Sequence, residues 1–234
     1  MIASSSSSYS SNAGTSGCSF LIDSVLLNKN PCGCLLERSR FNRRSRQLIW
    51  LVQIIRQAIN TQISPNNIVI IDSFPLSLCQ LVRNHRTHVF NELADIGYNS
   101  SKHLWVYGFK VHMLVTLSGY ILNYVVTPAS VHYIRAVDDL LENCSQPYVL
   151  SDLAYLSYEL REQLKQKGYH LWTPLRQNMA RAKQHNHWKL MAMRRTIEMC
   201  FFDVEQTLAR GLTGLQLRME KIVLTYNLRY FEIN

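Results

Sequence analysis

Residues 68–74 read IVIIDSF, a β-branched and almost wholly apolar run with a single acid, Asp72. Turn-forming residues precede it at Pro65, Asn66 and Asn67, and a short apolar run bounded in this way is typical of a buried strand. A carboxylate inside such a strand costs free energy unless it is paired, protonated or bound to a cation. The stretch therefore predicts a central strand whose one charged side chain needs a partner.

The hydrophobic pattern places further elements around this strand. Four more strands are expected, at residues 105–117, 120–127, 148–152 and 169–175. Ser118 and Gly119 separate the first two of them, which predicts an antiparallel hairpin. Helices are expected after the hairpin at residues 131–143, 156–167, 188–210 and 215–230. This order predicts an α/β fold with a mixed five-stranded sheet flanked by helices.

A basic segment, residues 37–64, precedes the first strand. Its apolar residues recur at helical spacing, which predicts a helix with one apolar side made by Leu48, Leu51, Ile54, Ile55 and Ile59. Its start is rich in arginine, at Arg38, Arg40, Arg43, Arg44 and Arg46. These side chains fit two interpretations equally well, a patch that contacts phosphates or the solvated start of a helix.

Composition and charge narrow the class of protein. The chain has 234 residues, a formal net charge of +9 and six cysteines without the dense spacing of a disulfide scaffold. A basic surface attracts polyanions, of which nucleic acid is the commonest and an anionic membrane the rival. Residues 1–36 are rich in serine and resemble no secretory signal. We expect a cytoplasmic protein whose first 36 residues are a disordered or unrelated leader.

Three acids fall at the positions where the predicted elements could bring them together. Asp72 lies in the first strand, Asp152 ends the fourth, and Glu198 lies on a late helix. Mg²⁺ prefers oxygen ligands, so a few carboxylates together with substrate phosphates suit it. Two such ions, about 3.5 to 4 Å apart, would serve an in-line displacement at phosphorus. The alternative for each acid is a structural role, in a turn or an ion pair with arginine.

Four blocks of sequence occur in order along the chain: IVIIDSFPL, YGFKVHMLV with TPASVH, YVLSDLAYLS, and RRTIEMCFF. Together they resemble the successive blocks of DDE transposases from bacterial insertion sequences, over residues 38–231. The segment RSRFNRRSRQL also resembles the one that precedes the catalytic core in that family. The chain departs from the family pattern at Ser151 and Leu153, beside the second acid, and at Glu205, where many relatives have a basic residue.

The resemblance implies an RNase H-like catalytic domain over residues 65–234, preceded by the basic helical segment 37–64. By this resemblance Asp72, Asp152 and Glu198 are the catalytic, metal-binding triad, with two Mg²⁺ or Mn²⁺ ions as cofactor. It implies DNA as the partner, both as element ends and as target, and a homo-oligomer on DNA associated with the nucleoid. The residues expected to contact DNA are Arg40, Arg43, Arg44, Lys110, Arg194 and Arg195.

The implied activity is metal-dependent cleavage of DNA followed by strand transfer of an insertion sequence. Two alternatives remain open at this point. One is an RNase H-like nuclease that cuts without joining. The other is an inactive DNA-binding remnant or regulator, which agrees with the altered neighbours of Asp152. Only a serine-rich stretch precedes Arg38, whereas such relatives usually begin with a larger DNA-binding region, so we also expect a chain truncated at its N-terminus.

Overall fold

The computed structural model describes residues 37–233, except for 64–65, 80, 84, 100–102, 196, 199–200, 202–208 and 210. The predicted leader, residues 1–36, lies outside the described residues. The strands are β1 Ile68–Ser77, β2 Asp95–Asn99, β3 Leu104–Thr116, β4 Ile121–Pro128, β5 Tyr148–Ser151 and β6 His170–Trp172. The helices used below are α2 Arg38–Gln47, α3 Ile49–Gln62, α4 Val137–Leu140, α5 Tyr158–Gln166, α6 Ala182–His185, α7 Trp188–Arg194 and α9 Leu212–Ile233.

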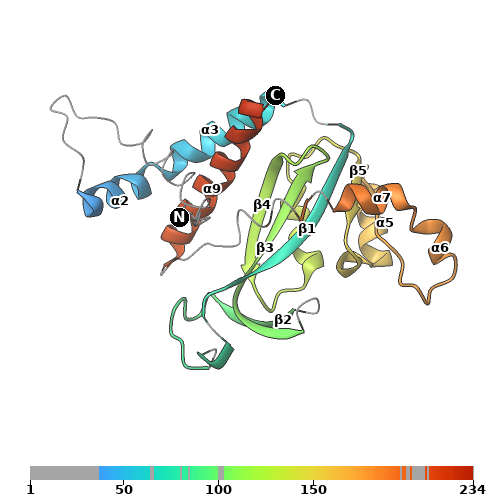
Figure 1. Cartoon of the computed structure of the whole chain (residues 1–234), viewed down its shortest axis with the longest axis horizontal. Coiled ribbons are helices and arrows are strands. Elements are labelled where there is room, and N and C mark those ends of the chain that lie inside the picture. Colours follow the sequence, from blue (N-terminus) through green and yellow to red (C-terminus); the bar gives the residue numbers. More distant parts are fainter. Residues whose placement is uncertain are drawn as a thin grey trace, which may run out of the picture.

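The strands form one mixed sheet with β1 and β3 at its centre (Figure 1). β3 is antiparallel to β1 on one side and shares its other side between β4 and the short β2. β5 is parallel to β1, and β6 is parallel to β5. The five predicted strands and the predicted hairpin are confirmed, and so is the α/β arrangement of a mixed sheet flanked by helices. β2 is an additional strand that the pattern did not predict.

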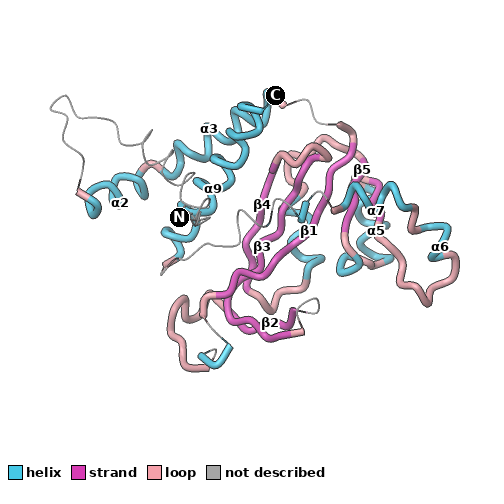
Figure 2. Tube along the Cα trace, viewed as in Figure 1, coloured by secondary structure: helices cyan, strands magenta, loops and turns pink. Residues whose placement is uncertain are grey.

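The run IVIIDSF forms β1 because both faces of this strand are buried. Ile70 packs into the core on one face, with Met219 and Val223 of α9. Ile71, one residue on, packs into the core on the opposite face, with Leu164 of α5. Side chains alternate across a strand, so an uninterrupted apolar run is suited to a sheet covered by helices on both sides. Figure 2 shows α3 and α9 on one side of the strands.

Local signals end the elements where the sequence predicted. Gly119 adopts a φ of +96° in the hairpin turn, and Gly168 adopts a φ of +87° just after α5, a backbone conformation that glycine takes without the steric cost of a Cβ. At the start of α5, the Ser157 hydroxyl accepts a hydrogen bond from the Leu160 amide at 3.3 Å, as an N-cap does. The glycines let the chain turn, and the Ser157 cap satisfies an amide at the start of α5 that has no partner within the helix.

The predicted helix of the basic segment is two helices, because the chain breaks at Leu48 between α2 and α3. The apolar side of this segment is largely exposed, and a different side of α3 is buried. Ile54 is 52% exposed, whereas Val52 and Arg56 are buried. The physical reason is that α3 is held by polar anchors: the Arg56 Nε donates to the Glu220 carboxylate of α9 at 2.9 Å, and this pairing sets which face turns inward.

The predicted helix over 188–210 is described as α7, Trp188–Arg194, and Ile197, Glu198 and Phe201 are helical beyond it. The prediction over 215–230 is confirmed by the longer α9, Leu212–Ile233. Residues 131–143 contain only a short 3-10 turn, Tyr133–Ala136, followed by the single turn of α4. Within the described parts of the chain, we find no helix with the length and apolarity needed to cross a membrane.

Candidate active site

The strand register brings Asp72 and Asp152 together. β1 and β5 are parallel neighbours in which Ile71 is paired with Ser151. The next residue along each chain is therefore an acid, and Asp72, in the middle of β1, lies beside Asp152, which follows the end of β5. Asp152 comes directly after β5 and precedes a short 3-10 turn, Leu153–Tyr155. Two carboxylates 80 residues apart in sequence thus become neighbours through backbone pairing alone.

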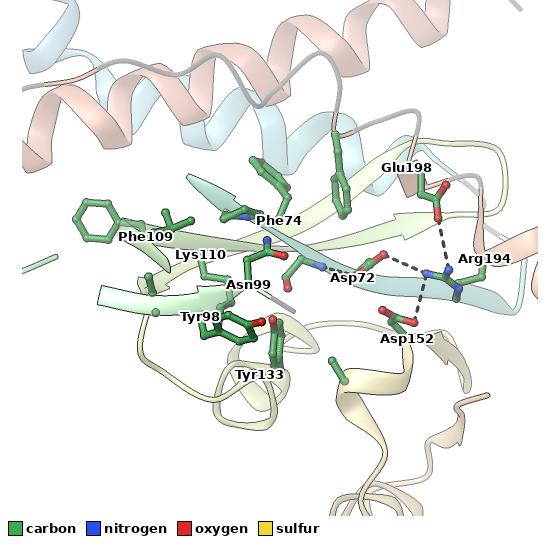
Figure 3. Close-up of a pocket in the computed structure, with 17 residues that line it drawn as sticks. Asp72, Phe74, Tyr98, Asn99, Phe109, Lys110, Tyr133, Asp152, Arg194 and Glu198 are labelled. Atoms are coloured by element: carbon green, nitrogen blue, oxygen red, sulfur yellow. Dashed lines mark hydrogen bonds and ion pairs between the residues drawn. The ribbon is translucent and has the colours of Figure 1, made fainter. Parts of the chain in front are cut away.

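Glu198 reaches the same place from the helical stretch after α7, and Arg194 lies between all three acids (Figure 3). The Arg194 Nη1 lies 3.3 Å from the Asp72 Oδ2 and 3.7 Å from the Asp152 Oδ1. Its Nη2 lies 3.4 Å from the Glu198 Oε1. Arg194 and Glu198 are four residues apart, so they share one helix face. The structure therefore brings together all three predicted acids, around a guanidinium.

The electrostatics at Asp72 depart strongly from those of a carboxylate in water. Burial raises the pKa of Asp72 to about 7, and the negative charge of Asp152 adds to this effect. Two contacts oppose it: the Ser73 amide donates to the Asp72 Oδ1 at 2.7 Å, and Arg194 supplies positive charge. Buried acids with a perturbed pKa in a cleft mark functional sites. Positive charge beside this carboxylate favours its ionised form.

A cavity of about 320 Å³ extends from the three acids along the sheet. Figure 3 shows Asp72 between Arg194 on one side and a group of larger side chains on the other. The side chains that line this second part are Phe74, Tyr98, Asn99, Lys110 and Tyr133. Four of them were not predicted. A signal for Tyr133 was available, because it directly follows the block TPASVH, but spacing alone did not distinguish it from a core residue.

Lys110, which was expected to contact DNA, and His112 lie two residues apart in β3, and their environments differ. The Lys110 Nζ donates to the Val131 carbonyl at 2.8 Å and lies 3.9 Å from the centroid of the Tyr133 ring. Burial lowers the pKa of Lys110. His112 is fully buried, and burial together with the Lys110 charge lowers its pKa to about 3. Lys110 therefore lines the cavity, while His112 is a neutral core residue.

Of the remaining predicted DNA contacts, all but Arg194 lie on the surface. Arg40, Arg43 and Arg44 are exposed on α2, which Figure 1 places at the end of the molecule farthest from α6. Arg195 is exposed beside the acids. Arg194 contacts the three carboxylates, as described above. A role in DNA binding stays a prediction for all of them.

A metal ion at this site would be bound by the three acids. Within the described residues, no three His, Cys, Asp or Glu side chains lie close enough to one another to hold a metal ion. The three carboxylates surround the guanidinium of Arg194 instead. Their donor atoms are all carboxylate oxygens, the type that Mg²⁺ and Mn²⁺ prefer. The residues fit a hard divalent cation in chemical type, at a position where a positive group already lies.

Comparison with known proteins adds three findings. A family model described as a transposase DDE domain matches residues 62–210, the range that holds all three acids and Arg194. A cryo-EM structure of a piggyBac transposase synaptic complex with hairpin DNA is similar at 14% identity and a TM-score of 0.43. That match covers 85% of this chain and 55% of the other, so this chain spans about half its length. No curated protein matches.

Proposed function

Because the chain belongs to the family of transposase DDE domains, we propose that it cuts DNA at the ends of an insertion sequence and joins the cut ends to target DNA, in a reaction that needs Mg²⁺ or Mn²⁺. The observation that carries this proposal is the convergence of Asp72, Asp152 and Glu198 around one positive group. The acids come from two strands and a helix, and they lie at the mouth of a cavity. A shared cationic position of this kind is what a metal-dependent phosphoryl-transfer site requires.

Asp72, Asp152 and Glu198 would hold the metal. When bound, divalent ions supply two functions: they lower the pKa of an attacking water or 3′-hydroxyl, and they stabilise the leaving oxygen. The chain itself then needs no nucleophilic side chain. Asp72 supplies a carboxylate from a strand that is paired on both sides, with β3 and with β5. Placement on a central strand limits the movement of the reacting groups.

The second part of the cavity suits a nucleotide. Lys110 is a buried cation over an aromatic ring, and Tyr98, Tyr133 and Phe74 offer ring surfaces beside it. A phosphate, together with the sugar or base attached to it, is a ligand that uses both features. We assign to these side chains the binding and orientation of the nucleotide next to the bond that is cut. The exposed arginines of α2 and the net charge of +9 would hold the DNA outside the cavity.

The test is cleavage and joining of DNA that carries the sequences flanking the gene, with the full chain and either Mg²⁺ or Mn²⁺. The variants Asp72→Asn, Asp152→Asn and Glu198→Gln should each lose nicking and joining by at least about a hundredfold, the scale on which loss of a key catalytic group is felt. The matched control is Glu142→Gln, which changes an exposed acid just after α4 and should keep full activity.

The possible outcomes separate the proposal from its rivals. Nicking and joining that both disappear in the three variants support the transposase. Nicking without joining identifies a nuclease that cuts only. DNA binding without nicking, at every metal concentration tested, identifies a non-catalytic DNA-binding protein that acts as a regulator of related elements. The observation that favours this last possibility is that Arg194 already neutralises the acids that a metal ion would need. We further propose that the chain acts as a homo-oligomer, since joining involves two element ends.

A further inference from the structure

Arg194 lies at the point nearest to all three acids. Its two terminal nitrogens contact the three carboxylates at 3.3 to 3.7 Å, and its side chain is only 14% exposed. Asp72, at 13% exposed, is equally enclosed, whereas Asp152 and Glu198 are 38% and 57% exposed. The guanidinium therefore contacts the whole triad from a largely enclosed position.

The contacts that hold Arg194 there are loose. Charge-assisted hydrogen bonds between nitrogen and a carboxylate are usually about 2.7 to 2.9 Å long and often bidentate. Each acid here offers one oxygen at a longer distance. In addition, the Arg194 Nε is buried and has no hydrogen-bond partner in the described part of the chain. Two of the contacts are hydrogen bonds, from Nη1 to Asp72 at 3.3 Å and from Nη2 to Glu198 at 3.4 Å, and both are longer than usual, which leaves the side chain open to displacement.

We infer that Arg194 is a built-in counter-ion, which neutralises the three acids while no divalent ion is bound and has to withdraw before one can bind. The inference rests on the proposed function for the identity of the competing cation. Its physical basis is that two positive groups within about 4 Å of one another repel strongly in a partly buried site. Arg194 therefore sets the metal affinity of the free protein. It acts on the metal through the three acids and is a positioning residue.

The experiment is a titration of the full chain with Mn²⁺ at pH 8 without DNA, followed by calorimetry or by the electron paramagnetic resonance signal of free Mn²⁺. The variant Arg194→Gln keeps most of the side-chain volume and removes the charge. We expect it to bind Mn²⁺ about tenfold more tightly or better, within the usual range of coupling between two ligands. Arg176→Gln removes an exposed arginine from the neighbouring loop and should leave the affinity unchanged.

A second variant and a second readout guard against effects on folding. Arg194→Gln combined with Asp152→Asn should lose the gain in affinity, which places the bound ion at these acids. Without metal, Arg194→Gln should melt at a lower temperature than the unaltered chain, because three acids then lack their counter-ion. Added Mn²⁺ should raise its melting temperature by more than that of the unaltered chain, since a ligand stabilises in proportion to its affinity.

The outcomes distinguish this inference from the proposed function. Equal Mn²⁺ affinities for Arg194→Gln and the unaltered chain overturn the inference and leave metal-dependent cleavage standing. Tighter binding by Arg194→Gln supports the inference even if no DNA is ever cut, in which case the proposed function alone fails. If neither protein binds Mn²⁺ at millimolar concentration, the inference is refuted, and the metal dependence of the proposed function is decided by the cleavage assay, in which DNA phosphates complete the site.

Discussion

The ion pair between Arg56 and Glu220 should be among the largest single contributions to holding α3 on α9. The Arg56 Nε and the Glu220 Oε2 lie 2.9 Å apart, and their side chains are 9% and 4% exposed. Glu220 also accepts hydrogen bonds from the Tyr124 hydroxyl at 3.0 Å and the Gln53 amide at 3.3 Å. Removing the charge of Glu220 leaves a buried guanidinium without its anion, which typically costs about 3 to 5 kcal/mol.

The perturbation is Glu220→Gln, measured by urea unfolding at neutral pH with tryptophan fluorescence. We expect the free energy of unfolding to fall by about 3 kcal/mol or more, since glutamine keeps some hydrogen bonds but no charge. The partner variant Arg56→Met should cost a similar amount. The double variant should cost less than the two costs added together, by at least about 1 kcal/mol. Each single variant leaves one buried charge without its partner, whereas the double variant leaves neither.

Burial rather than distance decides this magnitude, and the chain carries its own control. Lys167 Nζ and Asp138 Oδ1 are only 2.6 Å apart, but their side chains are 51% and 64% exposed. Exposed pairs contribute about 0 to 1 kcal/mol, so Asp138→Asn should change the unfolding free energy by less than about 1 kcal/mol. If Glu220→Gln costs no more than Asp138→Asn, or if the double variant shows additive costs, the pair is not buried in solution. The docking of α3, and of the basic helix α2 before it, would then have to be reconsidered.

Three further predictions concern the sheet. Burial lowers the pKa of His112 to about 3, so between about pH 6.5 and pH 3 the unfolded chain binds a proton at this side chain and the folded chain does not. The free energy of unfolding therefore decreases as the pH falls below about 6.5, by about 2 kcal/mol at pH 5. The difference in unfolding free energy between the native chain and His112→Gln should shrink by that amount from pH 7 to pH 5, and a constant difference would contradict the burial. Asn227→Leu should lower the unfolding free energy by about 2 to 4 kcal/mol, because the Asn227 side chain bonds both the amide and the carbonyl of Ile121 at 3.0 and 2.8 Å; a neutral result in urea unfolding would show that water replaces it. A Cβ at Gly97 would lie 2.0 Å from the backbone oxygen of Ala129, so Gly97→Ala should reduce the free energy of unfolding by about 1 to 3 kcal/mol. It should lower the melting temperature and weaken the proposed DNA cleavage, whereas an unchanged melting temperature would mean that β2 moves freely.

Much of the fold could be predicted because its signals are local. The apolar run around Asp72 forms a strand from its own composition, and the glycine at 119 closes a hairpin from its own backbone freedom. The exceptions have a common cause. β2 is a short strand of mixed burial with no apolar alternation, and it pairs only because β3 extends past β4 and offers a free edge. The apolar side of α3 does not show which face is buried, because Arg56 is buried through its partner on α9, which lies 164 residues away.

The candidate site divides in the same way. The sequence by itself determined which residues could carry the chemistry: the acids at 72, 152 and 198, and the elements that hold them, since each lies in a segment whose conformation follows from nearby residues. Only the tertiary structure decided how they meet. The parallel register of β1 and β5 makes Asp72 and Asp152 neighbours, and the approach of the helix after β6 puts Arg194 between them. Registers and helix positions depend on contacts between distant parts of the chain, and no local pattern of residues contains that information.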